Sequence, residues 1–224
     1  MKSLLKKLLL ALLEPVEFGL LIFSAAFTLN YWQGWVFLAA FTVPGYLFGI
    51  YLLRTNPAAL ERRRRGGPTA EARPAQKAVM GIAWLSLAAM MVVSALDHRF
   101  GWSHVPTAIC VVGDVLVAVG VSVMMLVVVQ NSYASATIRV ESGQELISTG
   151  LYRVVRHPMY TGNVILMVGV PLALGSYWGL VFVVTGLLIL TWRIRDEEEL
   201  LREELRGYQE YTQKVRSRLV PCMW

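Results

Sequence analysis

The chain has 224 residues, of which 56% are hydrophobic and only 16% are charged. A soluble domain of this size carries about 25% charged residues, so the composition excludes an ordinary soluble enzyme and indicates a polytopic membrane protein. The net charge is +6. Two cysteines are too few for a disulfide framework, and neither has other metal-ligand residues near it in the sequence. We expect no bound metal and no nucleic-acid partner.

Six apolar stretches follow one another along the chain. They cover residues 16–32, 35–53, 79–96, 105–129, 159–174 and 177–194. Most of them reach the roughly 17–25 residues that a helix needs to cross a bilayer, and the short stretch 159–174 calls for tilt or local thinning. We predict an all-α, polytopic membrane helix bundle of about six spans, or five if the last hairpin is counted differently, with a cytoplasmic C-terminal helix.

The basic residues are distributed unequally between the two sides that this span count defines. With six spans, 20 of the 21 Lys and Arg residues fall on one side, and only Arg99 falls on the other. Cytoplasmic loops carry an excess of Lys and Arg, so both termini and the long connectors are predicted to be cytoplasmic. A wrong span count would scatter these charges over both sides, so the asymmetry supports the count.

The N-terminal region, residues 1–134, is predicted to form two membrane hairpins that turn at 30–34 and 97–105. The lysine- and leucine-rich first fourteen residues fit either an amphipathic helix on the cytoplasmic face or an extension of the first span. The connector 54–78 carries the basic run 61–65, which reads as a topology anchor or as a contact for anionic lipid head groups.

Three ionisable side chains of this region call for an interpretation. Asp114 is a carboxylate well inside a span, where acids often mark function, and it either hydrogen-bonds a neighbouring helix or faces an outer cavity. His98 and His104 fall in the second turn and are expected to be ordinary residues of an external loop.

The C-terminal region, residues 135–224, is predicted to be the functional core. The connector 130–158 is polar and long, and connectors of this length tend to be functional. It leads into GLYRVVRHPMYTG at residues 150–162, which opens the last apolar hairpin. The chain then leaves the membrane as a charged helix with the acidic run 196–199.

Two polar clusters are expected to meet at the cytoplasmic mouth of this hairpin, because the two ends of an antiparallel helix pair lie side by side. They hold Arg156, His157 and Tyr160 on one side and Arg193, Glu197 and Glu198 on the other. Arg193 and Glu197 are four residues apart and share a helix face. Pro158 suits the first turn of a helix, where free amides favour an anionic group. The residues alone leave open whether this is a ligand site or a set of interfacial anchors.

This C-terminal region resembles the isoprenylcysteine carboxyl methyltransferase family, and the phospholipid N-methyltransferases are similar. The resemblance rests on GLYRVVRHPMYTG, the hairpin after it, the paired glutamates with Leu201 three residues beyond Glu198, Tyr208-x-x-Tyr211, and the closing residues 218–221. It covers roughly residues 135–224, about 40% of the chain. It implies a membrane methyltransferase that uses S-adenosylmethionine and acts on a lipophilic acceptor, such as a prenylated carboxylate, a small molecule or a lipid head group.

The resemblance also implies roles for single residues. The cofactor would lie in a cytoplasm-facing pocket formed by the connector, the last hairpin and the C-terminal helix. Its contacts would be Gln144, Glu145, Leu146, Ile147, Tyr152, Arg156, His157, Pro158, Met159, Tyr160 and Glu197. Arg193 would face the acceptor, and Glu198 would complete the catalytic set by hydrogen-bonding His157 or by packing the pocket. Because three glutamates are consecutive, a register shift of one would move the glutamate roles to Glu198 and Glu199.

Several alternatives remain open at this stage. NADPH-dependent sterol-type reductases have similar C-terminal regions, and a non-catalytic membrane protein could keep the same scaffold. The class of acceptor is open as well. A carboxylate acceptor needs no general base, so positioning can carry most of the rate. An amine acceptor, as in phospholipid N-methylation, needs a proton acceptor, for which Glu197 and Glu198 are candidates.

Overall fold

The computed structural model describes residues 2–64, 74–134, 143–221 and 224, with side chains left out for 2–12, 62–64 and 74–75. All regular elements of these residues are helices, so the predicted all-α class is confirmed. The α-helices are α1 (Lys2–Ala26), α2 (Trp32–Thr55), α3 (Pro57–Arg64), α4 (Pro74–Phe100), α5 (Thr107–Gln130), α6 (Pro158–Ala173), α7 (Val181–Glu204) and α8 (Tyr208–Lys214). Two short 3-10 helices, η2 (Gly150–Arg153) and η3 (Trp178–Leu180), precede α6 and α7.

Four helical stretches of the described residues are long and apolar enough to cross a membrane. They are Trp32–Thr55, Gln76–Phe100, Thr107–Gln130 and Trp178–Glu204. The helix α6 is apolar but has only 16 residues, about 24 Å at 1.5 Å per residue, against a hydrocarbon core of about 30 Å. The structure thus supports an integral membrane protein, while the count of six spans stays a prediction for α1 and α6.

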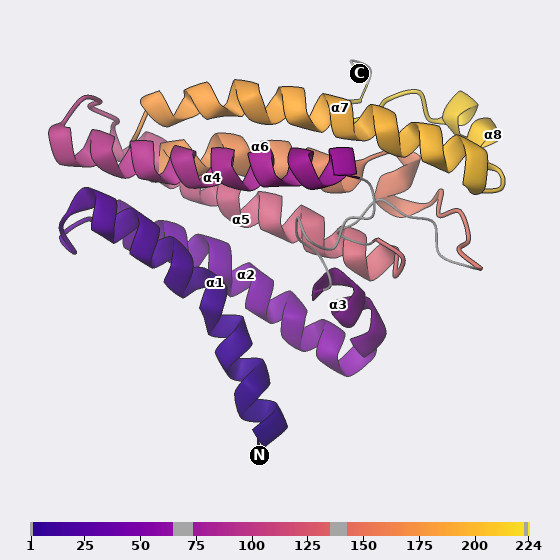
Figure 1. Ribbon diagram of the computed structural model, residues 1–224, viewed down its shortest axis with the longest axis horizontal. Coiled ribbons are helices and arrows are strands. Elements are labelled where there is room, and N and C mark those ends of the chain that lie inside the picture. The colour runs from indigo at the N-terminus through magenta and orange to yellow at the C-terminus, as the bar shows by residue number, and fades with distance from the viewer. Residues whose placement is uncertain (1, 65–73, 135–142, 222–223) are drawn as a thin grey trace.

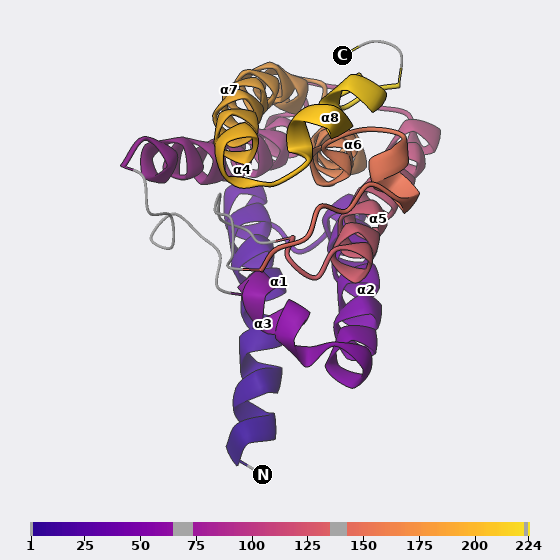
Figure 2. The same cartoon turned by 90° about the vertical axis from the view of Figure 1, so that its right-hand side faces the viewer.

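The helices α4 to α7 run along the long axis of the molecule, whereas α1 and α2 cross below them (Figure 1). The helices α3 and α8 and the described residues 143–157 of the connector before α6 gather at one end. Figure 2 looks at this end, with α8 beside α6 and α3 on the opposite side. The helix α1 runs without a break from Lys2 through Pro15 to Ala26, as an extension of the first predicted span requires.

Close contact of glycines holds α6 against α5. A Cβ atom at Gly120 would lie 2.8 Å from the carbonyl oxygen of Gly162, and one at Gly169 would lie 2.8 Å from the amide nitrogen of Val117. Small residues let membrane helices approach this closely. The contact fixes the height of α6 along α5 and therefore the place of the polar segment that precedes α6.

The first predicted turn is wrong by a few residues. The helix α1 ends at Ala26 and α2 already begins at Trp32, so the turn lies at 27–31 rather than at 30–34. Gly34 continues the helix because its missing side chain makes room for Ile22 and Phe23, which would lie 3.2 Å from a Cβ atom there. Close packing of two helices, rather than a helix break, therefore explains this glycine.

The second turn begins later than predicted, because α4 continues to Phe100 and takes in Asp97 and His98. His98 is therefore not a loop residue, and its ring stacks on Tyr31 at 3.9 Å between centroids. The buried carboxylate of Asp97 accepts hydrogen bonds from the Ser103 amide at 2.6 Å and from the Ser176 hydroxyl at 2.5 Å. These contacts tie α4 to the turn between α6 and α7.

The structure shows no hydrogen bond from Asp114 to a neighbouring helix among the described residues, and the alternative that it faces an outer cavity stays a prediction. Its side chain is buried in α5, and its two carboxyl oxygens have no hydrogen-bond partner among the described residues. It does not line the large cavity described below. The basic run 61–65 extends beyond the described residues at Arg65.

Candidate functional site

The segment that opens α6 is held by the C-terminal tail. The backbone amides of Arg156 and His157 donate to the carbonyl oxygens of Ser217 and Arg218 at 2.9 and 3.0 Å. The Thr161 hydroxyl donates to the carbonyl oxygen of Leu219 at 2.8 Å. Pro158 then occupies the first helical position, which costs no hydrogen bond there. The tail thus fixes the backbone from which His157 and Tyr160 project.

Glu198 forms a closed charge cluster behind this segment. Its side chain is 1% exposed and lies 2.9 Å from Arg156 Nη1, 3.3 Å from His157 Nε2 and 3.1 Å from the Nη2 atoms of Arg202 and Arg218. Three guanidinium groups thus surround one carboxylate, so the buried charge is paired and hydrogen-bonded. We refer to Glu198, Arg156, Arg202 and Arg218 as the arginine cluster. It binds α7 to the start of α6 and to the tail.

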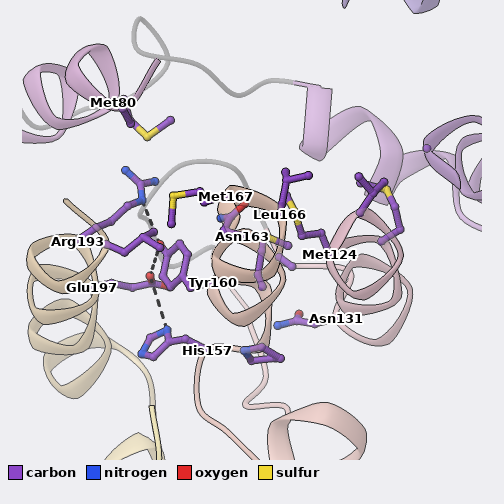
Figure 3. Close-up of a pocket in the computed structure, with 18 of the residues that line it drawn as sticks. Met80, Met124, Asn131, His157, Tyr160, Asn163, Leu166, Met167, Arg193 and Glu197 are labelled. Atoms are coloured by element: carbon purple, nitrogen blue, oxygen red, sulfur yellow. Dashed lines mark hydrogen bonds and ion pairs between the residues drawn. The ribbon is translucent and has the colours of Figure 1, made fainter. Parts of the chain in front are cut away.

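Glu197 faces the other way. Its side chain is 25% exposed, and its Oε2 accepts a hydrogen bond of 2.6 Å from the Tyr160 hydroxyl. The same hydroxyl accepts one from Arg193 Nε at 3.0 Å, and His157 Nδ1 lies 3.9 Å from Glu197 Oε2. Figure 3 shows these side chains on one wall of a cavity. We call Arg193, Tyr160, Glu197 and His157 the polar row.

Gln76, at the start of α4, joins this row from the N-terminal region. It is 1% exposed, accepts a hydrogen bond from Arg193 Nη1 at 3.0 Å and donates one to Asp196 Oδ2 at 2.6 Å. No motif marks this residue in the sequence. The only local signal is that Gln76 is a polar residue just before an apolar stretch, and that pattern is common at helix ends.

The connector and the C-terminal helix form a second wall. The Tyr152 hydroxyl accepts a hydrogen bond from Asn131 Nδ2 at 3.1 Å, and the Tyr152 carbonyl oxygen accepts one from the Tyr211 hydroxyl at 2.6 Å. Burial raises the pKa of Tyr152 to about 12, so its phenol keeps its proton at neutral pH. Asn131 is a further cavity residue that no sequence motif indicated.

A cavity of about 1150 Å³ unites the two walls with an apolar space between α2, α4, α5, α6 and α7. The predicted cofactor contacts all line it: Gln144, Glu145, Leu146, Ile147, Tyr152, Arg156, His157, Pro158, Met159, Tyr160 and Glu197. Arg193 lines it as well, whereas Glu198 belongs to the arginine cluster and Glu199 is exposed. The two walls form its polar part, and the remainder is its apolar arm, with side chains such as Met80, Trp84 and Met124.

This arrangement has two chemically different compartments that meet at the polar row. The polar part offers a carboxylate, an imidazole, phenols and an irregular backbone, which suits a charged, hydrogen-bonding ligand. The apolar arm suits a lipophilic body. Among the described residues, no three His, Cys, Asp or Glu side chains are grouped as a metal site would need.

Comparison with known proteins shows that the region that forms this site is similar in sequence to several known enzymes. Residues 108–206 match the family model described as phospholipid methyltransferase. Over 113 residues, 48% of this chain, the sequence is 37% identical to a probable protein-S-isoprenylcysteine O-methyltransferase of Oryza sativa subsp. indica and to its counterpart in subsp. japonica. Over 91 residues, 39% of the chain, it is 31% identical to Delta(14)-sterol reductase TM7SF2 of Mus musculus.

The alignments cover 59% of the length of the rice relatives and 22% of that of the mouse relative. The resemblance to the isoprenylcysteine and phospholipid methyltransferase families is confirmed for this part of the chain. The two rice relatives are named as probable methyltransferases, and the mouse sterol reductase shows that a related sequence also occurs in an enzyme of another class.

Proposed function

We propose that this protein is a membrane methyltransferase that uses S-adenosylmethionine to methylate a lipophilic acceptor of the isoprenylcysteine carboxylate type. One observation carries the proposal. The polar row of Arg193, Tyr160, Glu197 and His157 stands where a polar compartment and an apolar arm of one cavity meet. A two-substrate enzyme that joins a charged cofactor to a lipophilic acceptor needs this kind of junction.

The polar part has the groups that the cofactor requires. S-Adenosylmethionine has a positively charged sulfonium and amino group, a carboxylate and a flat adenine, and it supplies a methyl group already activated by the sulfonium. Glu197 offers the cations a partly exposed carboxylate that is hydrogen-bonded by Tyr160. Tyr152 offers an aromatic wall, and the stretch 144–147 offers backbone groups for the adenosyl moiety.

Arg193 would bind the acceptor. The residue is 6% exposed, and hydrogen bonds to Tyr160 and Gln76 orient its guanidinium from two sides. An arginine held in this way can pair with a carboxylate in a defined geometry. The apolar arm would hold the lipophilic body of the acceptor, which would enter from the bilayer.

The residues of the site would act by binding and orientation rather than by proton transfer. A carboxylate acceptor has no proton to lose, so its methylation by the bound cofactor would require no general base from the protein. The fixed positions of Arg193 and Glu197 would bring the two reactants together, and the apolar arm would exclude water from them.

The topology proposed for the chain follows from its charges. With 20 of 21 Lys and Arg residues on one side, both termini and the mouth of the site would face the cytoplasm of an integral membrane protein. The cofactor would enter from the cytoplasm and the acceptor from the inner leaflet.

Two other functions have support from particular observations. The match to the phospholipid methyltransferase model favours an amine of a lipid head group as acceptor, with Glu197 as proton acceptor. The likeness to the mouse Delta(14)-sterol reductase favours an NADPH-dependent reductase on the same scaffold. Both predict a different ligand or product, so one set of measurements separates the three.

The test is calorimetry of the full chain in detergent with S-adenosylmethionine, S-adenosylhomocysteine and NADPH. We expect the first two to bind and NADPH not to bind. Methyl transfer from labelled cofactor is then measured with a farnesylated N-acetylcysteine, with phosphatidylethanolamine vesicles and with a membrane lipid extract. Binding of NADPH without binding of S-adenosylmethionine would refute the methyltransferase. If the labelled product is a methylated amine and not a methyl ester, the acceptor is a phospholipid amine and not a prenylated carboxylate.

A further inference from the structure

The apolar arm of the cavity has an unusual content of methionine. It is lined by Met80, Met90, Met124, Met125 and Met167, which come from α4, α5 and α6. Methionine side chains are flexible and polarisable and adapt to ligands of different shape. Such a lining holds a lipophilic body but does little to select the chemistry of its head group. Selection must then come from polar side chains near the reacting end.

Asn163 is a polar side chain in that position. It lies on α6 three residues after Tyr160, which places the two on the same helix face about one turn, or about 5 Å, apart. Figure 3 shows its amide pointing into the cavity between Met124, Leu166 and Met167. In the part of the chain that the structure describes, its side chain makes no hydrogen bond.

Thr42 gives the contrast within the same cavity. Thr42 also lines the cavity, but its hydroxyl donates a hydrogen bond of 2.7 Å to the carbonyl oxygen of Leu38 in its own helix. A polar group among apolar side chains is unfavourable unless it is hydrogen-bonded, and in membrane helices such groups are a mark of function. Thr42 meets this requirement within α2. Asn163 is left with its two donors and its acceptor directed at the cavity.

We propose that Asn163 is a specificity-determining residue that hydrogen-bonds the head group of the acceptor. The inference rests on the proposed methyltransferase function and deepens it. Arg193 and Asn163 project into the cavity from α7 and α6 on either side of Tyr160 (Figure 3). Arg193 pairs with a carboxylate oxygen of the acceptor, and the Asn163 amide N–H donates to a second hydrogen-bond acceptor of the same head group. The substrate class is therefore an amphiphile with a compact carboxylate head and a single apolar body.

The pair of side chains selects against a cationic head. An ammonium group would meet the guanidinium of Arg193, and only the Asn163 oxygen could accept from it. A carboxylate meets donors from both residues. Replacing Asn163 by leucine should weaken the binding of a carboxylate ligand. Replacing Asn163 by aspartate should weaken it further, because the two carboxylates repel each other, and should favour the binding of an amine.

The experiment measures binding to the full chain in detergent, saturated with S-adenosylhomocysteine. The probes are N-acetyl-S-farnesylcysteine, which has a free carboxylate, and farnesylamine. Tryptophan fluorescence reports binding because Trp84 lines the cavity. The proteins are the wild type, Asn163→Leu, Asn163→Asp and the control Thr191→Val. The Thr191 hydroxyl donates to the carbonyl oxygen of Leu187 in its own helix, and Thr191 does not line the cavity. Calorimetry with S-adenosylmethionine shows for each protein whether the cofactor site is intact.

We expect the dissociation constant of the carboxylate probe to rise about 10-fold in Asn163→Leu and further in Asn163→Asp, where farnesylamine should bind more tightly than in the wild type. Cofactor affinity should stay within twofold in all variants, and Thr191→Val should match the wild type. Unchanged probe binding in Asn163→Leu, loss of cofactor binding together with probe binding, or no probe binding by the wild type overturns the inference. If the wild type does not bind S-adenosylmethionine, the proposed function itself fails, and this inference falls with it.

Discussion

Glu197 and Glu198 are neighbours in α7, yet they have opposite surroundings. Glu198 is enclosed by Arg156, Arg202 and Arg218, and no part of its carboxylate is left for a ligand. Glu197 is bound to one neutral phenol and borders the cavity. The two side chains are about 100° apart around the helix, since an α-helix has 3.6 residues per turn. A saturated carboxylate holds the fold together, whereas a carboxylate with remaining hydrogen-bonding capacity can bind a ligand.

The largest expected effect is that of Glu198→Ala. It leaves the buried guanidinium group of Arg156 without its counter-ion, which costs about 3–5 kcal/mol of stability. Thermal unfolding in detergent should show a large fall in midpoint, with loss of all ligand binding as a consequence. The exposed neighbour gives the control, since Glu199→Ala should leave the midpoint unchanged. A stable Glu198→Ala protein would show that the arginine cluster does not hold the tail and α6 together.

Glu197→Gln should separate binding from stability. The glutamine can still accept the Tyr160 hydrogen bond, so the unfolding midpoint should stay close to that of the wild type. The cofactor loses a charge-assisted contact worth about 1.5–3 kcal/mol, which corresponds to roughly 10- to 100-fold weaker binding. Calorimetry with S-adenosylmethionine measures this. Wild-type affinity in this variant would remove Glu197 from the cofactor site.

Gln76→Leu should affect the acceptor rather than the cofactor. The variant removes the amide that orients Arg193 and leaves its Nη1 without this acceptor. We expect acceptor kcat/KM to fall by about 10-fold, in line with one lost hydrogen bond to a charged group, with cofactor affinity unchanged. Asp196→Asn is the matched variant, because its amide oxygen can still accept from Gln76. A similar loss in both would mean that Gln76 acts through Asp196 and not through Arg193.

The smallest effect is expected at the paired tyrosines of α8. Tyr211→Phe removes the hydrogen bond to the Tyr152 carbonyl oxygen and should cost about 1 kcal/mol of stability. Tyr208 is buried next to it, and its hydroxyl has no hydrogen-bond partner among the described residues, so Tyr208→Phe should be neutral or slightly stabilising. Chemical denaturation of the two variants compares them. Equal destabilisation would show that the Tyr211 hydrogen bond does not support the connector.

Local signals predicted the helices well. The stretch 105–129 corresponds to α5 at Thr107–Gln130, and 159–174 corresponds to α6 at Pro158–Ala173. Hydropathy over a window of this length depends only on the residues within it, so neighbouring helices do not alter it. The turn at 27–31 was misplaced because Gly34 reads as a helix break, although it serves close packing of α1 and α2.

The candidate site was predicted only where its residues form a motif. The segment 156–160 and the acidic run 196–199 stand out in the sequence, and the structure brings them to one mouth. Gln76 lies 117 positions from Arg193 in the chain, and the tail residue Arg218 lies 20 positions from Glu198. No periodicity or spacing rule relates residues that meet through the packing of separate helices.

By itself, the sequence determined the helical class, the places of most apolar helices, the unequal distribution of basic residues and the two motifs of the candidate site. These features depend on composition and on short-range spacing. Only the tertiary structure decided which glutamate borders the cavity, that Gln76 orients Arg193, and that Asn163 is left without a partner. Each of these depends on how a helix is rotated and how closely it packs against its neighbours, as α6 does against α5 through Gly120 and Gly162.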